Sequence, residues 1–279
     1  MNHLRDWIGR SETRDDEISP TPVAAMAATL DLDKISVTSG APLPPLWHWL
    51  YFIPLAVQSE IGPDGHPKRG GFLPLVPLPR RMWAGGRLEF LRPLKVGETV
   101  TRRAQIKDVN IKEGRSGTLV FVTVSHEFST RDGVAIREEH DIVYRDNPRP
   151  DAPAPKPQLP HGKETFSREI EPDPVLLFRY SALTFNGHRI HYDRTYATEV
   201  EGYPGLIVHG PLIATLLMDL LHRNLPDAQV TLFNFRAVRP LFDINRFTVC
   251  GRRDGAQNVA LWACDHDGWL TMEATAEIT

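Results

Sequence analysis

This sequence has few cysteines, little excess charge of either sign and no long hydrophobic run. Two cysteines, Cys250 and Cys264, occur outside any C-x-x-C pair, so neither a disulfide framework nor a cysteine-based zinc site is indicated. The 32 basic and 35 acidic residues leave a net charge of −3, and no nucleic-acid partner is expected. The apolar run at 212–217 is too short to cross a membrane, and residues 1–10 lack the apolar stretch of a signal peptide. We therefore expect a globular, cytoplasmic protein.

Proline is concentrated in one segment near the middle of the chain. Residues 147–160 read NPRPDAPAPKPQLP and contain six prolines. Proline fixes φ and removes a backbone donor, so this segment is predicted to be an extended linker. It separates an N-terminal unit, residues 1–146, from a C-terminal unit, residues 161–279.

The two units share one pattern, a buried helix followed by a set of strands. Residues 211–221, PLIATLLMDLL, predict a helix that is buried all round, and residues 46–53 predict its shorter counterpart, ended by Pro54. A surface helix is expected at 19–32 and a mobile loop at 62–71. Alternating apolar residues and glycine-containing turns predict the strands, at 99–108, 117–130, 134–145, 229–238, 246–253, 256–266 and 269–279. The fold class is α+β, with two antiparallel sheets that each wrap a central helix.

Residues 180–193, YSALTFNGHRIHYD, contain the residues best suited to chemistry. His188, His191 and Asp193 lie within six residues of one another, beside Asn186. A helix predicted at 174–183 ends before Asn186, which places this cluster on a loop. Farther on, V-H-G-P at 208–211 opens the buried helix, where a glycine N–H and the helix dipole can stabilise negative charge on a ligand oxygen.

The strings FNGHRIHYD and YPGLIVHGPL resemble the MaoC-like enoyl-thioester hydratases. Together with PPLWHWLYF in the first unit, they are most similar to one branch of that family. This branch contains the mitochondrial-type 3-hydroxyacyl-thioester dehydratases and bacterial hydratases of mesaconyl- or 3-methylfumaryl-CoA. The resemblance implies a double hotdog fold and a hydro-lyase that adds water to a 2-enoyl thioester or removes it from a 3-hydroxyacyl thioester. It also implies a catalytic C-terminal unit and a non-catalytic N-terminal unit that binds the acyl chain and CoA.

The resemblance assigns catalytic roles by position. His191 matches the family's catalytic histidine, and Gly210 matches the glycine whose N–H holds the thioester oxygen. Asn186 stands where the broader family has a catalytic aspartate, and an amide takes up no proton. From the residues alone, His191 is the expected base. Asn186 would orient the water, and either His188 or Asp193 would complete the proton relay, although Asp193 is slightly favoured as the cap of 194–198.

Four further residues are candidates for substrate binding. Arg189, which replaces a proline of the family, is expected either to pair with a substrate carboxylate or to remain a solvated loop charge. Arg236 and Arg239 are candidates for the phosphates of CoA, and His209 is expected to hold the turn before Gly210. No metal and no cofactor are predicted, because CoA or acyl carrier protein arrives with the substrate. A two-histidine, one-carboxylate metal site, built from His188, His191 and Asp193, is the less favoured alternative.

Two other functions remain open at this stage. The first is a hotdog acyl-CoA thioesterase, and the second is a non-catalytic subunit that binds acyl thioesters and has lost its chemistry at Asn186. The expected partner in every case is an acyl-CoA. The oligomeric state stays open, and a homodimer of double hotdogs is one option. The sequence leaves the acyl chain, the carrier and the physiological direction undetermined.

Overall fold

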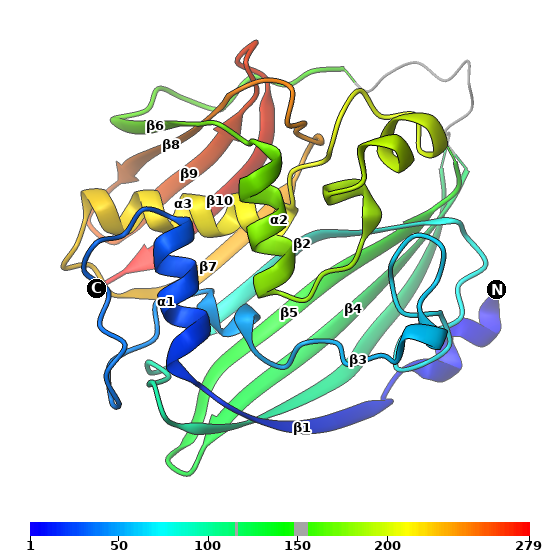
Figure 1. Ribbon diagram of the computed structural model, residues 1–279, viewed down its shortest axis with the longest axis horizontal. Coiled ribbons are helices and arrows are strands. Elements are labelled where there is room, and N and C mark those ends of the chain that lie inside the picture. The colour runs from blue at the N-terminus through cyan, green and yellow to red at the C-terminus, as the bar shows by residue number, and fades with distance from the viewer. Residues whose placement is uncertain (115–116, 148–155) are drawn as a thin grey trace.

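One antiparallel sheet of ten strands forms the centre of the molecule (Figure 1). The computed structural model describes residues 1–114, 117–147 and 156–279, so most of the predicted linker at 147–160 lies outside the described residues. The strand order is β1-β3-β4-β5-β2-β7-β10-β9-β8-β6. The bounds are β1 (Ser11–Glu17), β2 (Arg80–Phe90), β3 (Thr99–Gly114), β4 (Gly117–Thr130), β5 (Gly133–Arg145), β6 (Phe166–Ile170), β7 (Val230–Ala237), β8 (Phe247–Asp254), β9 (Asn258–Cys264) and β10 (Leu270–Ile278).

The two units meet edge to edge, at the pairing of β2 with β7. Five residue pairs join these strands, from Gly85 opposite Arg236 to Glu89 opposite Leu232. A β-carbon on Gly85 would lie 2.5 Å from the carbonyl oxygen of Phe235, and one on Gly86 would lie 2.8 Å from the Phe235 ring. Glycine is therefore needed here for the two half-sheets to approach and form one continuous sheet.

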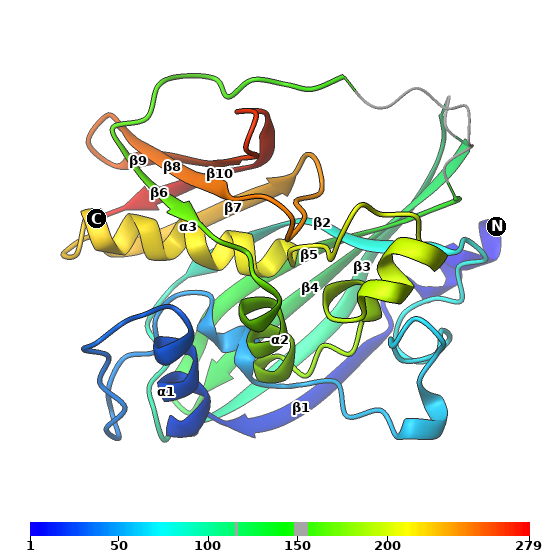
Figure 2. The same ribbon diagram turned by 45° about the horizontal axis from the view of Figure 1, so that its top comes forward.

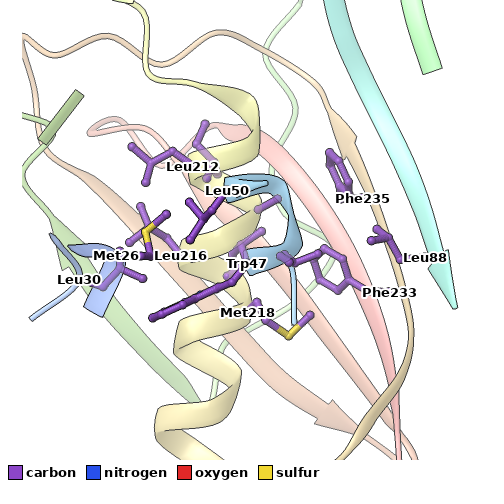
Figure 3. Close-up of a cluster of buried hydrophobic side chains, with 14 of the residues drawn as sticks. Met26, Leu30, Trp47, Leu50, Leu88, Leu212, Leu216, Met218, Phe233 and Phe235 are labelled. Carbon is purple, nitrogen blue, oxygen red and sulfur yellow. The ribbon is translucent and has the colours of Figure 1, made fainter. Parts of the chain in front are cut away.

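The long helix α3 (Gly210–Asn224) lies in the concave side of this sheet (Figure 2). Every residue from Leu212 to Leu221 is buried, as the apolar run predicted. Figure 3 shows how Leu212, Leu216 and Met218 of this helix pack against side chains from both units. Helix α2 (Pro174–Leu183) coincides with the predicted helix, and α1 (Pro20–Thr29) lies beside it.

The prediction of a helix at 46–53 is correct for only a single turn. Only Trp47–Leu50 is helical, as a 3-10 turn. Leu46 before it and Phe52 after it have φ values of +72° and +56°, which no right-handed helix accepts. Helix α1, expected at the surface, instead contributes buried side chains to the core of this unit: Val23, Met26 and Ala27. The two units are therefore unequal: only the C-terminal one contains a long central helix.

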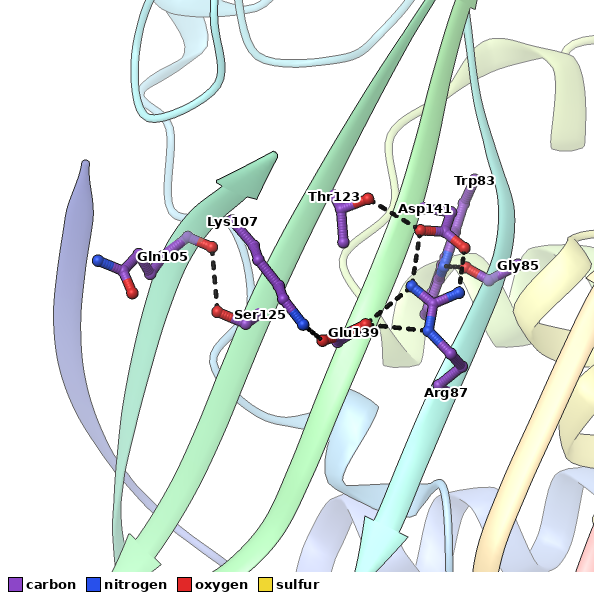
Figure 4. Close-up of polar contacts among 9 residues, drawn as sticks. All are labelled: Trp83, Gly85, Arg87, Gln105, Lys107, Thr123, Ser125, Glu139 and Asp141. Carbon is purple, nitrogen blue, oxygen red and sulfur yellow. Dashed lines mark hydrogen bonds and ion pairs between the residues drawn. The ribbon is translucent and has the colours of Figure 1, made fainter. Parts of the chain in front are cut away.

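Ion pairs connect the strands of the N-terminal unit on the exposed face of the sheet (Figure 4). The Arg87 guanidinium on β2 donates to both carboxylate oxygens of Asp141 on β5, at 2.6 and 2.9 Å, and to Glu139 at 2.9 Å. Lys107 on β3 reaches Glu139 from the other side. The Arg87 side chain is 46% exposed, so these pairs contribute little to stability individually and mainly fix the register of the strands.

The opposite face of β5 buries a carboxylate. Glu138 is 2% exposed, accepts a hydrogen bond from Trp49 Nε1 at 2.8 Å, and lies 3.0 Å from His48 Nε2 and 2.6 Å from His140 Nε2. Burial alone would raise the pKa of Glu138, but His140 and His48 hold it well below its usual range. A buried carboxylate is tolerated because both of its oxygens have partners. No helix in the described parts of the chain is long and apolar enough to cross a membrane.

Candidate active site

The loop that follows α2 is shaped by its own side chains. Asp173 caps the start of α2 by accepting the N–H groups of Val175 and Leu176. After the helix, Phe185 adopts a φ of +50°, and the N–H of Asn186 donates to the carbonyl of Ser181 at 2.8 Å. The Asn186 side chain then accepts the N–H of His188 at 3.1 Å. This Asx turn points the chain toward a 3-10 turn, Arg189–His191, and gives Asn186 a definite structural role.

His191 is held at the end of that turn in one tautomer. Its side chain is 7% exposed, and its Nδ1 lies 2.7 Å from the carbonyl oxygen of Ile207. A carbonyl only accepts, so Nδ1 carries the proton and Nε2 keeps its lone pair. Burial lowers the pKa of His191 to about 4, against the opposing effect of the Ile207 carbonyl. The imidazole is therefore neutral at pH 7 and has the form that a general base requires.

The start of α3 lies directly beside this imidazole. The His209 ring stacks on His191 with 3.7 Å between ring centroids, and His209 Nε2 lies 2.8 Å from the Ser181 hydroxyl. Gly210 is the first residue of α3, so its N–H belongs to the first turn, whose donors have no intrahelical partner. A β-carbon on Gly210 would meet nothing closer than the Trp83 carbonyl oxygen at 3.9 Å. His191 therefore lies beside the N-terminus of α3, and the base and the oxyanion donor of a thioester reaction must lie close together in this way.

His188 and a loop of the N-terminal unit complete the cluster. The His188 ring lies 5.4 Å from His191 and 4.0 Å from His66, measured between ring centroids. His66 Nδ1 in turn lies 3.2 Å from Asp64 Oδ2. Burial lowers the pKa of His188 to about 2, and the neighbouring His66 and His191 contribute to the shift. Both His188 and His191 are therefore neutral at physiological pH.

Asp193 and Arg189 bind each other, at the edge of the cluster. The Arg189 guanidinium donates to Asp193 Oδ2 through Nε at 3.0 Å and Nη2 at 2.7 Å. The other oxygen of Asp193 accepts the N–H of Tyr196 at 3.0 Å. Asp193 thus has the capping role that the sequence slightly favoured. The metal site predicted as an alternative from His188, His191 and Asp193 is not formed, because both carboxylate oxygens of Asp193 are already engaged.

The two arginines predicted for CoA, one on β7 and one just after it, pair with carboxylates. Arg236 on β7 donates to Glu273 at 2.7 Å, and Arg239 lies 3.5 Å from Asp265. The Arg236 side chain is 60% exposed, so its guanidinium remains accessible to a ligand. A role of either residue at CoA stays a prediction.

Comparison with known proteins matches this arrangement to a family. The model of the family described as hydroxyacyl-thioester dehydratase type 2 matches residues 46–243. The chain is 48% identical over 273 residues to mesaconyl-C(4)-CoA hydratase of Chloroflexus aurantiacus, covering 98% of this chain and 96% of that one. The chain belongs to the hydroxyacyl-thioester dehydratase type 2 family. The mitochondrial hydroxyacyl-thioester dehydratase type 2 of Schizosaccharomyces pombe is 28% identical over 265 residues, 84% of this chain and 88% of that one.

A solved structure confirms the fold of this hydroxyacyl-thioester dehydratase type 2 member. A Mycobacterium tuberculosis protein described as having a double hotdog fold superposes with a TM-score of 0.60 and 14% identity, covering 98% of this chain and 96% of that one. The α+β double hotdog predicted from the motifs is therefore confirmed. The family also confirms the predicted reaction class, a hydro-lyase that acts on acyl thioesters.

Sequence reasoning missed two residues that the structure brings to this cluster, Asp64 and His66. Both precede the segment 180–193 by more than 100 positions and lie in the glycine- and proline-rich segment expected to be a mobile loop. The only feature of the sequence that could have pointed to them is an aspartate and a histidine among glycines. Asp64, His66 and His188 form the one three-residue group of the described chain whose potential metal-binding atoms all lie within 4.8 Å of one another. A hydrogen bond already joins two of them, and we assign them no metal.

Proposed function

We propose that this protein hydrates a 2-enoyl-CoA whose β-carbon bears a carboxylate, with mesaconyl-C4-CoA as the expected substrate. The single observation that carries the proposal is the placement of the neutral His191 imidazole beside the N-terminal glycine of α3. The 48% identity to a mesaconyl-C(4)-CoA hydratase supports the choice of acyl group.

In this proposal, the two groups act on opposite ends of the conjugated system. His191 Nε2 removes a proton from water while the water oxygen bonds to Cβ, and the C=C electron pair moves toward the thioester carbonyl. The Gly210 N–H and the dipole of α3 stabilise the resulting enolate oxygen. Cα then takes the proton back from the His191 imidazolium, the carbonyl reforms, and one water has been added. Asn186 fixes the loop that carries His191 and holds no proton.

The substrate carboxylate needs a cation close to the histidines, because in mesaconyl-C4-CoA it sits on the carbon that water attacks. Arg81 on β2 is the cation that we assign to this carboxylate. Its positive charge contributes to lowering the pKa of both His66 and His188, after the larger effect of burial. It shares a face of β2 with Trp83, whose carbonyl oxygen approaches Gly210. No carboxylate forms an ion pair with Arg81 among the described residues, whereas Arg189 is bound to Asp193.

The rest of the expected biochemistry is proposed on the same basis. Hydration by this route uses only the imidazole, the backbone N–H and water, so we propose that the enzyme needs no cofactor beyond the CoA of its substrate. A cytosolic location and a homodimer of double hotdogs remain predictions. Size-exclusion chromatography with light scattering measures the assembly directly.

The proposed function is tested by a substrate panel. The purified protein is assayed with mesaconyl-C4-CoA, itaconyl-CoA and a straight-chain enoyl-CoA, and each product is identified by mass spectrometry as a gain of one water. We expect the mesaconyl ester to have the highest kcat/KM. Release of free CoA thiol without hydration would show a thioesterase instead, and binding without turnover of any ester would show a non-catalytic subunit.

The variant Arg81→Gln separates the binding of the carboxylate from the chemistry. Loss of a bidentate, charge-assisted contact is worth about 1.5–3 kcal/mol, so kcat/KM for the mesaconyl ester should fall about 10- to 100-fold. The straight-chain ester, which has no carboxylate, should be affected much less. Arg189→Ala is the matched comparison, and we expect it to lower activity on both esters alike because Arg189 holds the loop. A selective loss in Arg189→Ala alone would assign the carboxylate to Arg189.

A further inference from the structure

The proposed reaction places a transient positive charge on His191, and the residues next to it offer little to balance that charge. Asn186 is neutral where the broader MaoC-like family has a carboxylate. His209 stacks on one side of His191 and is itself neutral, because burial lowers its pKa well below 6.5. His188 is neutral on another side, Arg81 beyond it is positive, and positive charge on His66 lowers the pKa of His191. A buried imidazolium without a nearby anion is costly.

The anion that faces this histidine cluster comes from the other unit. Asp64 lies on the loop that precedes β2, and two ring-to-ring contacts lead from its partner His66 to His191: His66 to His188 at 4.0 Å, and His188 to His191 at 5.4 Å. Burial raises the pKa of the Asp64 carboxyl, but its hydrogen bonds with His66 lower it by more, so the net pKa is well below the usual range. The carboxylate is therefore ionised at every pH at which the enzyme would work.

Specific contacts hold the Asp64 loop against the catalytic loop. The backbone N–H of Arg189 donates to the Asp64 carbonyl at 2.9 Å, and the Arg189 guanidinium donates to the Pro63 carbonyl at 3.0 Å. Gly65, with a φ of +88°, packs so closely on Gly187 that a β-carbon would lie 1.8 Å from the Gly187 carbonyl oxygen. Three consecutive residues of the N-terminal unit thus touch the segment that carries His188 and His191.

We propose that Asp64 and His66 take over the role of the missing catalytic carboxylate, so that each active site is built from both units of the chain. His66 positions His188, and the negative charge of Asp64 stabilises the positive charge that forms on His191 when it takes the proton of water. This inference rests on the proposed function for the identity of the reaction. It changes the expectation that the N-terminal unit is non-catalytic. Asp64 and His66 are positioning residues here, because they act through His188 and His191.

Asp193 is the nearest acidic residue in the sequence, but it is not suited to this role. Both of its oxygens are engaged, one by the Arg189 guanidinium and one by the Tyr196 N–H. Its charge is therefore balanced by Arg189 at the edge of the cluster. Asp64 has no arginine or lysine within ion-pair distance among the described residues, and its one ion-pair partner there is His66.

The test is the pH dependence of Asp64→Asn, which keeps the shape of the side chain and removes its charge. Loss of the anion disfavours the His191 imidazolium and lowers its pKa, so the acidic limb of the kcat/KM profile should move to lower pH by about one unit. One pKa unit corresponds to about 1.4 kcal/mol, so we expect kcat at pH 7 to fall about tenfold, with KM changed less than threefold. Glu60→Gln is the matched control, because Glu60 lies on the same loop with a side chain 62% exposed. Its profile should match that of the wild type.

Returning a carboxylate to position 186 provides a second, independent test. In Asn186→Asp the side chain still accepts the His188 N–H, so the Asx turn is retained. The double variant Asp64→Asn/Asn186→Asp should recover most of the lost kcat and return the acidic limb toward its original pH. If Asp64 only supported the loop, the charge at position 186 would restore neither, and that result would overturn the proposal. Wild-type kinetics in Asp64→Asn would also overturn it.

Two measurements separate this proposal from a metal site and from failure of the proposed function. Protein dialysed against EDTA, with its metal content verified, should keep full activity; loss of activity that zinc restores would refute the proposal. NMR titration of the histidines needs no substrate. There, Asp64→Asn should lower the pKa of His66 because it removes the negative charge next to Nδ1. An unchanged His66 titration would refute the pair even if the enzyme acts on another thioester.

Discussion

Gly65 is the position at which one added methyl group should separate the two halves of the active site. In Gly65→Ala the new β-carbon would lie 1.8 Å from the carbonyl oxygen of Gly187 and 2.8 Å from its carbonyl carbon. Ordinary contact begins at 3.4 Å, so the loops must move apart by about 1.6 Å. Because both contacts are to backbone, no side-chain rotation relieves them.

A displacement of this size acts mainly on catalysis. Misplacement of a catalytic group by 1 Å costs on the order of 100-fold in rate, so we expect kcat of Gly65→Ala to fall about 100-fold. The left-handed φ of +88° adds about 1–2 kcal/mol of backbone strain in alanine, which lowers the free energy of unfolding. Stability alone would not remove activity at 25 °C, because a typical domain has 5–15 kcal/mol in reserve.

Gly70→Ala is the matched control. Gly70 has nearly the same φ, +93°, but its β-carbon would meet nothing closer than the Leu75 side chain at 3.7 Å. Both variants therefore carry the same backbone strain, and only Gly65→Ala carries the clash. The assay is steady-state hydration of mesaconyl-C4-CoA, with urea unfolding of both variants measured in parallel. A Gly65→Ala enzyme with kcat within threefold of Gly70→Ala would refute the reasoning.

Three further predictions concern the helix terminus, the buried carboxylate and acid stability. Gly210→Ala should lower kcat about 100-fold, because the added methyl group crowds the thioester. The free energy of unfolding should be equal or higher, because the new β-carbon has room and alanine favours the helix. Steady-state kinetics and urea unfolding, measured in parallel, check both. Glu138→Gln should lower the free energy of unfolding by about 3–5 kcal/mol, because Glu138 is buried. Its neighbour Glu139 is partly exposed, so Glu139→Gln should lower the free energy of unfolding by at most about 1 kcal/mol. The pKa of His191 is about 4 when folded and near 6.5 when unfolded, so the unfolded chain binds more protons between these values and stability falls as pH drops through them. Between pH 7 and 4, His191→Gln should lose about 3 kcal/mol less stability than the wild type in urea titrations, and equal losses would contradict this.

The parts of the fold predicted from the sequence are those with a strong hydrophobic period. Helix α3 comes from a run that is apolar nearly all round, and the strands β7–β10 come from β-rich segments between glycine-containing turns. Their predicted bounds differ from the observed ones by a few residues. Strand β1 reads SETRDDE and contains no apolar residue, so no period could reveal it; it is held as an edge strand by backbone bonds to β3. Strand β2 was missed because Gly85 and Gly86 interrupt its pattern, although those glycines are what allow the two half-sheets to join.

The candidate site was predictable where its residues are close in sequence. His191, Asn186 and Gly210 belong to short motifs, and the structure brings all three to one place. Asp64 and His66 approach His188 only because the chain folds back across more than 100 residues, and no local pattern encodes that contact. The role of Asn186 illustrates the same limit. The family resemblance implies that Asn186 replaces a carboxylate, but only the fold brings Asp64 and His66 next to His188.

The most direct test of the account is the rate of mesaconyl-C4-CoA hydration by His191→Ala. This variant removes the imidazole that stacks on the N-cap residue of α3, and circular dichroism verifies that the fold is retained. We expect kcat to fall at least about 1000-fold, because general acid–base catalysis of this kind contributes about 10²–10⁴-fold. A kcat within tenfold of the wild-type value would contradict the account, because His191 would then not handle the proton.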